Sequence, residues 1–209
     1  MHLTRQAAPT NLPIQRKGTK YIVRTLDNPK SSVPVLIAVR DILKLAKNAR
    51  EVKKMINLKL LKINGRVVRD YHETIKLFNI FDADKSYFLS LLPTGKFFFK
   101  EAKNSSSRLC KIMGKTNLPK NIIQFNLHDG SNIISKEKFN IGDTLIIDFS
   151  NKIKQHIPLE KGRHVLVISG KNIGLEGKVL EVKDKKALIK FRDKEVAVEL
   201  STSQVIAYE

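Results

Sequence analysis

Leu-Leu-Lys-Ile-Asn-Gly-Arg-Val-Val-Arg stands at positions 60–69 of the 209-residue chain. Asn-Gly between apolar-rich flanks is the strongest short signal for a β-hairpin, because both central residues of its turn need a positive φ. Two arginines, Arg66 and Arg69, come just after the turn. This stretch therefore predicts a tight hairpin with positive charge beyond its tip.

Two short helices are predicted before the hairpin. Over residues 33–47 the apolar residues fall on one helical face, and Pro34 suits a first turn. A second helix begins at Asn48, which can cap it, and Glu51 completes a capping-box pattern. A basic helix face is most often only solvated, but here the acids that would pair with it are nearly absent, so we expect nucleic-acid contact. The basic residues of the two faces are Arg40, Lys44, Lys47, Arg50, Lys53 and Lys54.

The rest of the chain reads mainly as strands, so the expected fold class is α+β and mostly β. Strands at 87–92 and 95–100 complete a small α+β domain over 33–102, and the polar residues 103–108 read as a linker. Short β-type runs at 109–113, 122–127, 133–134 and 144–149 predict a central β domain within 103–160. Strands around 165–167, 179–182, 187–191 and 196–200, with tight glycine turns, predict a five-stranded barrel over 161–209.

Residues 1–32 read as an extended basic arm. Pro9, Pro13 and Pro29 break helices, and there is little apolar periodicity. A disordered tail is the alternative, but we expect the arm to order against a partner that neutralises it. Its basic residues are Arg5, Arg16, Lys17, Lys20 and Arg24.

The net charge of +19 points to a polyanionic partner. Residues 1–60 hold 13 Lys/Arg and 3 Asp/Glu, a net of +10, so the main contact is expected there. With 42% apolar residues the chain is not merely a disordered basic tail. No apolar run is long enough to span a membrane, and the N-terminus has no signal-peptide core. The absence of Trp argues against a platform that stacks many bases.

Catalytic and metal sites find no support in the residue spacing. The glycines around Gly177 fail the phosphate-loop pattern, because Asn172 and Val179 stand where that loop needs Gly and Ser or Thr. His72-Glu73 and His128-Asp129 are adjacent pairs, whose side chains point to opposite faces of a strand. Cys110 has no partner cysteine and is expected to be a buried small hydrophobe. We therefore predict no catalytic residue, metal, cofactor or small-molecule substrate.

The glycine cluster at 169–178 leaves two interpretations open. Its glycines serve tight turns in a small barrel, which is a purely structural role. An exposed glycine-rich loop also lets backbone amides approach phosphate, with Lys171 and Asn172 beside them. We expect both roles to apply.

These motifs together resemble a known family. The KOW motif of ribosomal and transcription-elongation proteins has the spacing of Gly162, Val165, Val167, Gly170, Gly174, Gly177 and Val179. The helix pair running into residues 60–66 resembles the alpha-L RNA-binding fold. Both occur in this order, around a β domain, in the archaeal and eukaryotic small-subunit ribosomal protein family "S four e". Its N-terminus is also similar to His2-Leu3-x-Arg5-x-Ala7-Ala8-Pro9.

The resemblance implies a non-enzymatic constituent of the small (40S) ribosomal subunit, located in cytoplasmic ribosomes and in the nucleolus during assembly. Its partners would be small-subunit rRNA and neighbouring ribosomal proteins, without a membrane. Because the chain stops at Glu209, soon after the barrel, it is identified as a shortened member. The implied RNA-binding residues, besides those of the arm, are Arg40, Lys44, Lys47, Arg50, Lys53, Lys54, Arg66, Arg69, Lys171, Asn172, Gly174 and Lys178.

Two other functions remain open at this point. The alpha-L fold also accompanies pseudouridine synthases, but residues 93–209 are too short and too rich in β-turns for their catalytic domain. A free KOW-bearing elongation factor or RNA chaperone would act on and off its partner, and sedimentation with ribosomal particles separates it from a ribosomal constituent.

Overall fold

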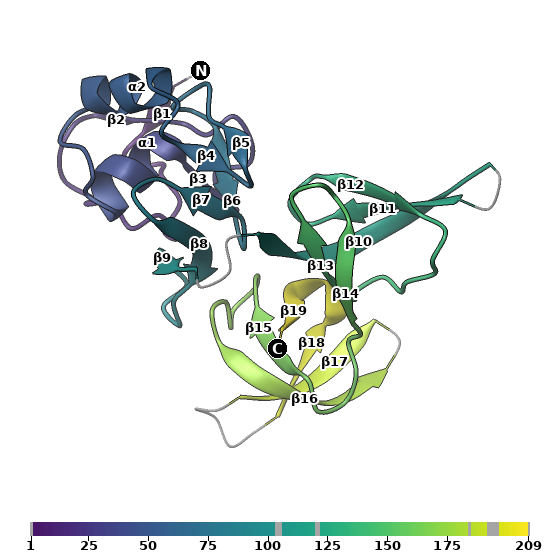
Figure 1. Cartoon of the computed structure of the whole chain (residues 1–209). Coiled ribbons are helices and arrows are strands. Elements are labelled where there is room, and N and C mark those ends of the chain that lie inside the picture. Colours follow the sequence, from purple (N-terminus) through teal and green to yellow (C-terminus); the bar gives the residue numbers. More distant parts are fainter. Residues whose placement is uncertain (1, 103–105, 120–121, 184, 192–196, 209) are drawn as a thin grey trace. The chain divides into compact units, whose positions relative to one another are not determined.

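The computed structural model describes residues 2–102, 106–119, 122–183, 185–191 and 197–208. The chain forms two compact units (Figure 1). Unit 1 comprises Met1–Leu92 and Lys96–Ser105, and unit 2 comprises Pro93–Gly95 and Ser106–Glu209. Residues 103–105 of the predicted linker lie outside the described residues.

Unit 1 contains a five-stranded antiparallel sheet in the order β5-β4-β7-β8-β9. At its hairpin, Asn64 and Gly65 have φ values of 50° and 77°, so the turn predicted there is confirmed. Ile80 donates its backbone N–H to Asn64 Oδ1 at 2.9 Å, which joins the hairpin tip to β7. The strands are β4 (Lys62–Ile63), β5 (Arg66–Val67), β7 (Ile80–Asp82), β8 (Ser86–Leu91) and β9 (Phe97–Glu101).

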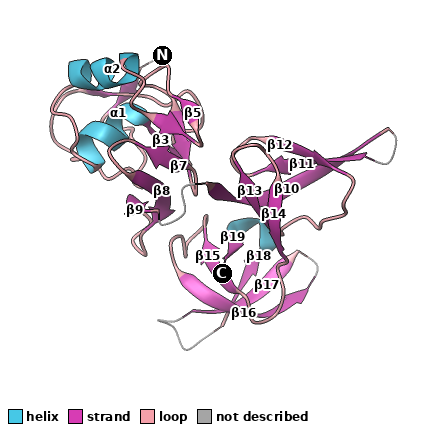
Figure 2. Ribbon diagram, viewed as in Figure 1, coloured by secondary structure: helices cyan, strands magenta, loops and turns pink. Residues whose placement is uncertain are grey.

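Helix α2 (Ala49–Asn57) begins where the capping pattern predicts. The side chain of Asn48 accepts a hydrogen bond from Glu51 N–H at 3.0 Å. In return, the Glu51 carboxylate accepts from the backbone N–H of Lys47 at 2.7 Å. Val52 and Ile56 point inward and are buried. Because the cap satisfies backbone donors that have no intrahelical partner, this short helix has a fixed start. In Figure 2, α2 and α1 both lie in unit 1.

The helix predicted over 33–47 is wrong in its length. Strand β3 (Ser32–Pro34) pairs with β6 (Thr74–Lys76), after which come α1 (Val35–Ile37) and a π-helical turn (Ala38–Ile42). Residues 33–39 are all buried, and a run that is apolar on every side does not distinguish strand from helix. Lys44, with φ 57°, lies beyond the helical turn. Arg40, Lys44 and Lys47 therefore do not form the expected helical stripe.

The N-terminal segment is folded as part of unit 1, whereas the sequence predicts an extended arm over 1–32. Strands β1 (Leu3–Thr4) and β2 (Tyr21–Ile22) pair antiparallel. Ala8 and Leu12 are only 5% and 4% exposed. The backbone oxygen of Asn11 accepts a hydrogen bond from Phe97 N–H of β9 at 2.9 Å. These contacts join residues that are far apart in the sequence, so they leave no periodicity that a sequence pattern would show.

The first part of unit 2 is a five-stranded antiparallel sheet in the order β12-β11-β10-β13-β14. Four of its strands were predicted, and the fifth, β14, was missed because three of its five residues are exposed and polar. Phe125 and Cys110 are fully buried in its core, which confirms the expectation for the cysteine. The strands are β10 (Ser107–Leu118), β11 (Ile122–Leu127), β12 (Asn132–Ser135), β13 (Thr144–Asp148) and β14 (Ile153–Ile157).

The second part of unit 2 is a five-stranded antiparallel sheet in the order β18-β17-β16-β15-β19. Its two edge strands follow each other in the sequence through one 3-10 turn (Thr202–Gln204), so the sheet curves into the predicted small barrel. A Cβ at Gly177 would lie 2.7 Å from the Lys190 carbonyl oxygen, so only glycine fits there. The strands are β15 (His164–Val167), β16 (Glu176–Lys183), β17 (Lys186–Phe191), β18 (Val198–Ser201) and β19 (Val205–Tyr208).

The fold class, α+β and mostly β, is confirmed. The last barrel strand, β19, was not predicted as a separate strand. Val196, at the start of the strand predicted over 196–200, lies outside the described residues.

Candidate nucleic-acid interface

The outer face of α2 is cationic. Arg50, Lys53 and Lys54 are exposed, opposite the buried Val52 and Ile56. Within the described residues, no carboxylate forms an ion pair with any of the three basic side chains. The Nζ atom of Lys53 lies 5.0 Å from the centroid of the Tyr71 ring, a cation–π contact. The helix therefore presents positive charge that the protein itself does not neutralise.

The cations just before α2 fall into two kinds. Lys44 and Lys47 are exposed and belong to the loop that leads into the helix. Arg40 instead donates from Nε and Nη2 to the carboxylate of its neighbour Asp41, at 2.9 and 2.8 Å. These hydrogen bonds raise the pKa of the Arg40 guanidinium. The protein already supplies Arg40 with a counter-charge, so it is a weaker candidate for a phosphate contact than Lys44 or Lys47.

Glu73, which the sequence suggests only as half of an adjacent His-Glu pair, contacts both arginines beyond the hairpin turn. One of its carboxylate oxygens lies 2.7 Å from Arg66 Nη2, and the other accepts from the backbone N–H of Arg69 at 2.7 Å. The side chain of Glu73 is 11% exposed and that of Arg66 is 71% exposed. Arg66 is thus held in one orientation while its outer edge faces solvent, and Arg69 is exposed beside it.

The basic residues of the N-terminal segment have different roles. Arg5 donates to the backbone oxygens of Gln15 and Thr19 and to the Thr19 hydroxyl, at 2.7 to 2.8 Å. Arg16 donates to the backbone oxygen of Ala8 at 3.1 Å. Arg5 therefore holds the loop together. The basic residues Lys17, Lys20 and Arg24 are exposed and remain candidates for RNA contact.

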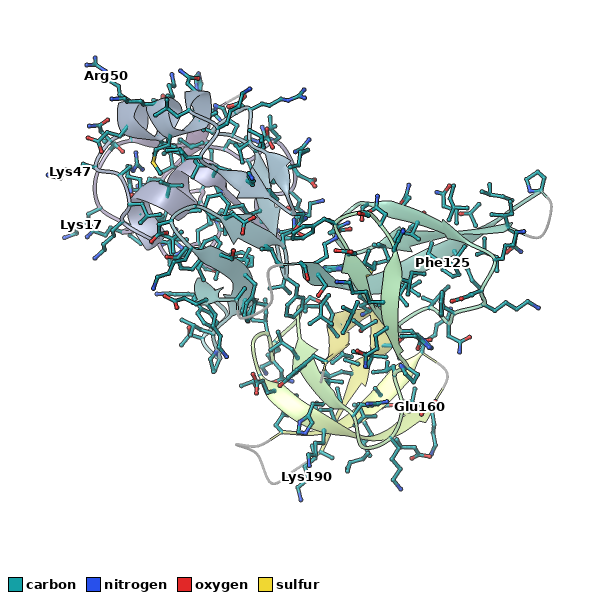
Figure 3. The ribbon with its side chains drawn as sticks, viewed as in Figure 1. Lys17, Lys47, Arg50, Phe125, Glu160 and Lys190 are labelled. Atoms are coloured by element: carbon teal, nitrogen blue, oxygen red, sulfur yellow. The ribbon has the colours of Figure 1, made fainter. Side chains whose placement is uncertain are left out.

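Helix α2, the loop before it and the N-terminal segment each place a basic side chain on the same side of unit 1. Figure 3 shows Arg50, Lys47 and Lys17 following one another along that side, each pointing away from the ribbon. Arg50 comes from α2, Lys47 from the loop before it, and Lys17 from the N-terminal segment. The fold thus gathers charges that are more than 30 residues apart in the sequence. A surface of this kind attracts the phosphate backbone of a nucleic acid.

In the barrel, the glycine loop favours the structural interpretation. Gly174 is buried with φ 83°, and its N–H donates to the Val167 oxygen at 2.8 Å. The amide of Gly174 is therefore used inside the loop rather than offered to phosphate. Asn172 is half-buried, and Lys171 beside it is exposed. Lys178 is exposed on β16, directly opposite Lys190 of β17, which Figure 3 shows pointing out from the barrel.

Two further basic residues, both on β10 of unit 2, are buried instead of exposed, and the sequence reasoning did not single them out. Arg108 Nη1 lies 3.1 Å from the Asp129 carboxylate, and both side chains are less than a tenth exposed. Lys111 is 1% exposed, and its Nζ donates to the backbone oxygens of Thr202 and Ser203 at 2.6 and 2.8 Å. Burial lowers the pKa of Lys111 to about 8. Arg108 and Lys111 thus link β10 to other segments of unit 2, and because both side chains are buried they are not accessible to a binding partner.

The described residues contain no group of three or more His, Cys, Asp or Glu side chains that could hold a metal ion. Among the helices in the described ranges, none is long and apolar enough to cross a membrane.

Comparisons with known proteins extend over most of the chain. The model "Ribosomal family S4e" matches residues 83–154, and the model "KOW motif" matches residues 161–197. A protein of Methanocaldococcus jannaschii named "Small ribosomal subunit protein eS4" is 38% identical over 197 residues, covering 87% of this chain and 81% of its own. A protein of the same name from Methanocella arvoryzae is 34% identical, with the same coverage of both chains.

The fold also matches a solved structure. The crystal structure of the 30S ribosomal protein S4e from Thermoplasma acidophilum superposes with a TM-score of 0.72. The two proteins are 24% identical, and the match covers 85% of this chain and 94% of the other. With relatives above 30% identity over most of both chains, this chain belongs to the S4e family of ribosomal proteins.

Proposed function

We propose that this protein is a structural constituent of the small ribosomal subunit. It binds rRNA through the side of unit 1 that carries Lys17, Lys47 and Arg50. The single observation that carries the proposal is the face of α2, where Arg50, Lys53 and Lys54 are exposed without a carboxylate partner among the described residues. Membership of the S4e family supports the same function, since that family is a class of ribosomal proteins and not of enzymes.

The proposed binding is electrostatic, and it involves no change in the conformation of the protein. Each Lys or Arg that contacts a phosphate releases condensed counterions, so affinity falls steeply as salt rises. Base edges of double-helical RNA are hidden in a deep and narrow groove, and recognition therefore depends on shape, phosphates and 2′-hydroxyl groups. The capped helix α2 and the Asn-Gly hairpin hold their cations in fixed positions, which reduces the entropy lost on binding.

The proposed contact residues form two groups. The principal group lies on unit 1 and consists of Lys17, Lys20, Arg24, Lys44, Lys47, Arg50, Lys53, Lys54 and Arg69. Arg5, Arg16, Arg40 and Arg66 hold local structure, although the outer edge of the Arg66 guanidinium also faces solvent. The second group lies on the barrel and consists of Lys171 and Lys178. Asn172 and Gly174 shape the loop beside Lys171. Neighbouring ribosomal proteins are further partners, and the proposed location is the cytoplasmic ribosome.

Sedimentation tests this function. A tagged chain expressed in an archaeal host should travel with the small subunit and with whole ribosomes on a sucrose gradient. Reversing two charges on α2, in Arg50→Glu with Lys54→Glu, should move most of the protein to the top fractions. The matched control is Lys96→Glu with Lys100→Glu, which changes the charge equally at exposed positions away from α2. Wild-type protein remaining in the top fractions would show a free factor instead.

A further inference from the structure

Tyr21 is 50% exposed, and it is the one aromatic residue among the large apolar residues that are exposed in the described part of the chain. It lies in β2, next to the exposed Lys20, whose Nζ is 5.4 Å from the centroid of the Tyr21 ring. The ring of His2 lies 5.2 Å from the same ring, tilted by 42°. A tyrosine ring is apolar on its faces and polar at its hydroxyl, and such side chains are enriched at interfaces, so an exposed ring among cations is a candidate contact.

The loop that carries Tyr21 is held in shape before any partner binds. Strand β2 pairs with β1, with Thr4 opposite Tyr21. The Arg5 guanidinium makes its three hydrogen bonds to Gln15 and Thr19 across this loop. It also covers Gly18, where a Cβ would come within 3.3 Å of the guanidinium carbon. The ring therefore has a fixed position, which lowers the entropic cost of placing a planar group on it.

The charge around the ring selects the kind of partner. The N-terminal segment has no Asp or Glu before Asp27, while Arg16, Lys17, Lys20 and Arg24 are exposed. A partner must therefore supply negative charge together with a flat surface for the ring. RNA supplies both, through its phosphates and its bases. In a duplex the faces of the bases are already stacked on one another, so the base must come from a single-stranded segment.

We infer that Tyr21 stacks on an unpaired base of single-stranded RNA, with Lys20 and Lys17 contacting the flanking phosphates. The inference rests on the proposed function, since it adds a single-strand contact to the duplex contacts of α2. One aromatic ring provides one stacking position, so this site holds a single unpaired base and not a run of bases.

The test measures binding of the full-length protein to two labelled probes, a short single-stranded RNA of mixed sequence and an RNA duplex of the same length. Tyr21→Ala should weaken binding to the single strand about tenfold, because stacking on an aromatic side chain is worth about 1–3 kcal/mol per base. Tyr21→Phe keeps the ring and should stay within about twofold of the wild type. Both variants should bind the duplex as the wild type does.

Several outcomes would overturn the inference. One is unchanged single-strand affinity in Tyr21→Ala, and another is an equal loss on the duplex in a folded variant, which would mean that Tyr21 does not act through an unpaired base. A Tyr21→Phe variant as weak as Tyr21→Ala would show that the hydroxyl matters and not the ring face. The proposed function fails separately, if the wild-type protein does not bind the duplex in a salt-dependent way. Far-ultraviolet circular dichroism confirms that each variant is folded.

Discussion

Helix α2 in unit 1 and strand β10 in unit 2 carry the same kinds of side chain in opposite surroundings. On α2, Arg50 and Lys54 face solvent with no carboxylate partner among the described residues. On β10, Arg108 pairs with a buried carboxylate and Lys111 donates to two backbone oxygens. The basic residues behind the net charge of +19 therefore have two different roles. Positive charge that the protein satisfies internally stabilises the fold, and only the remainder is available to RNA.

The largest effect is expected on the β10 side of this comparison. Arg108→Met removes the partner of Asp129, a carboxylate that is 3% exposed. Burial opposes ionisation of Asp129, but its hydrogen bonds with Ser131 and the charge of Arg108 together lower its pKa. Breaking such a pair should cost about 3–5 kcal/mol of unfolding free energy, measured by urea denaturation. The double variant with Asp129→Asn should recover part of the loss, and equal stability of Arg108→Met and wild type would contradict this role.

Neutralising the α2 side should change binding and leave stability almost unaltered. In the variant Arg50→Gln with Lys53→Gln and Lys54→Gln, affinity for an RNA duplex should fall about a hundredfold at low salt, because up to three phosphate contacts are lost. The slope of log affinity against log salt should become shallower by roughly 3. Binding titrations over a range of salt concentrations give both quantities. An unchanged slope would mean that α2 does not contact phosphates.

Lys111 on β10 should make the stability of the protein depend on pH. Its pKa is about 8 in the folded protein, below the ordinary lysine value of 10.5. Between pH 8 and pH 10.5, Lys111 is more protonated in the unfolded chain than in the folded protein. The contribution of Lys111 to the free energy of unfolding therefore rises with pH in this range. Relative to Lys111→Met, the wild type should gain about 2 kcal/mol between pH 7 and 10. Paired urea unfolding curves at the two pH values measure this gain, and a constant difference between the proteins would refute it.

The smallest effect concerns the start of α2. Asn48→Ala removes the side chain that accepts from Glu51 N–H, which should cost about 1 kcal/mol. Asn48→Asp keeps an acceptor oxygen at the same place and serves as the control. Thermal melting should separate these two variants. RNA affinity should fall only slightly in Asn48→Ala, since the cations themselves remain; a fall as large as that of the triple glutamine variant would show that the cap matters more for binding than the charges.

The elements that could be predicted are those whose signals are local. The Asn64-Gly65 turn and the Asn48 cap depend on residues within three positions of each other, so the sequence displays both. The exposed cations of α2 could be found for a similar reason, since nearby acids are scarce. The helix predicted over 33–47 was too long because residues 33–39 are buried on all sides and carry no periodicity.

The contacts that could not be predicted join residues distant in sequence. The bonds of Arg5 to Thr19 and of Lys111 to Thr202 cross 14 and 91 positions, and no motif announces either. Arg66 and Glu73 are only seven positions apart, but the turn between them brings the two side chains together. Whether a basic residue binds RNA or holds the fold therefore depends on tertiary contacts that composition does not reveal.

The most direct test of this division is a map of protein–RNA cross-links in assembled small subunits that contain this protein. We predict cross-links from small-subunit rRNA to residues 44–54 of unit 1, and none to Arg108 or Lys111. Cross-links confined to unit 2, with residues 44–54 unmodified, would contradict the assignment of the cationic face of α2 as the principal RNA contact.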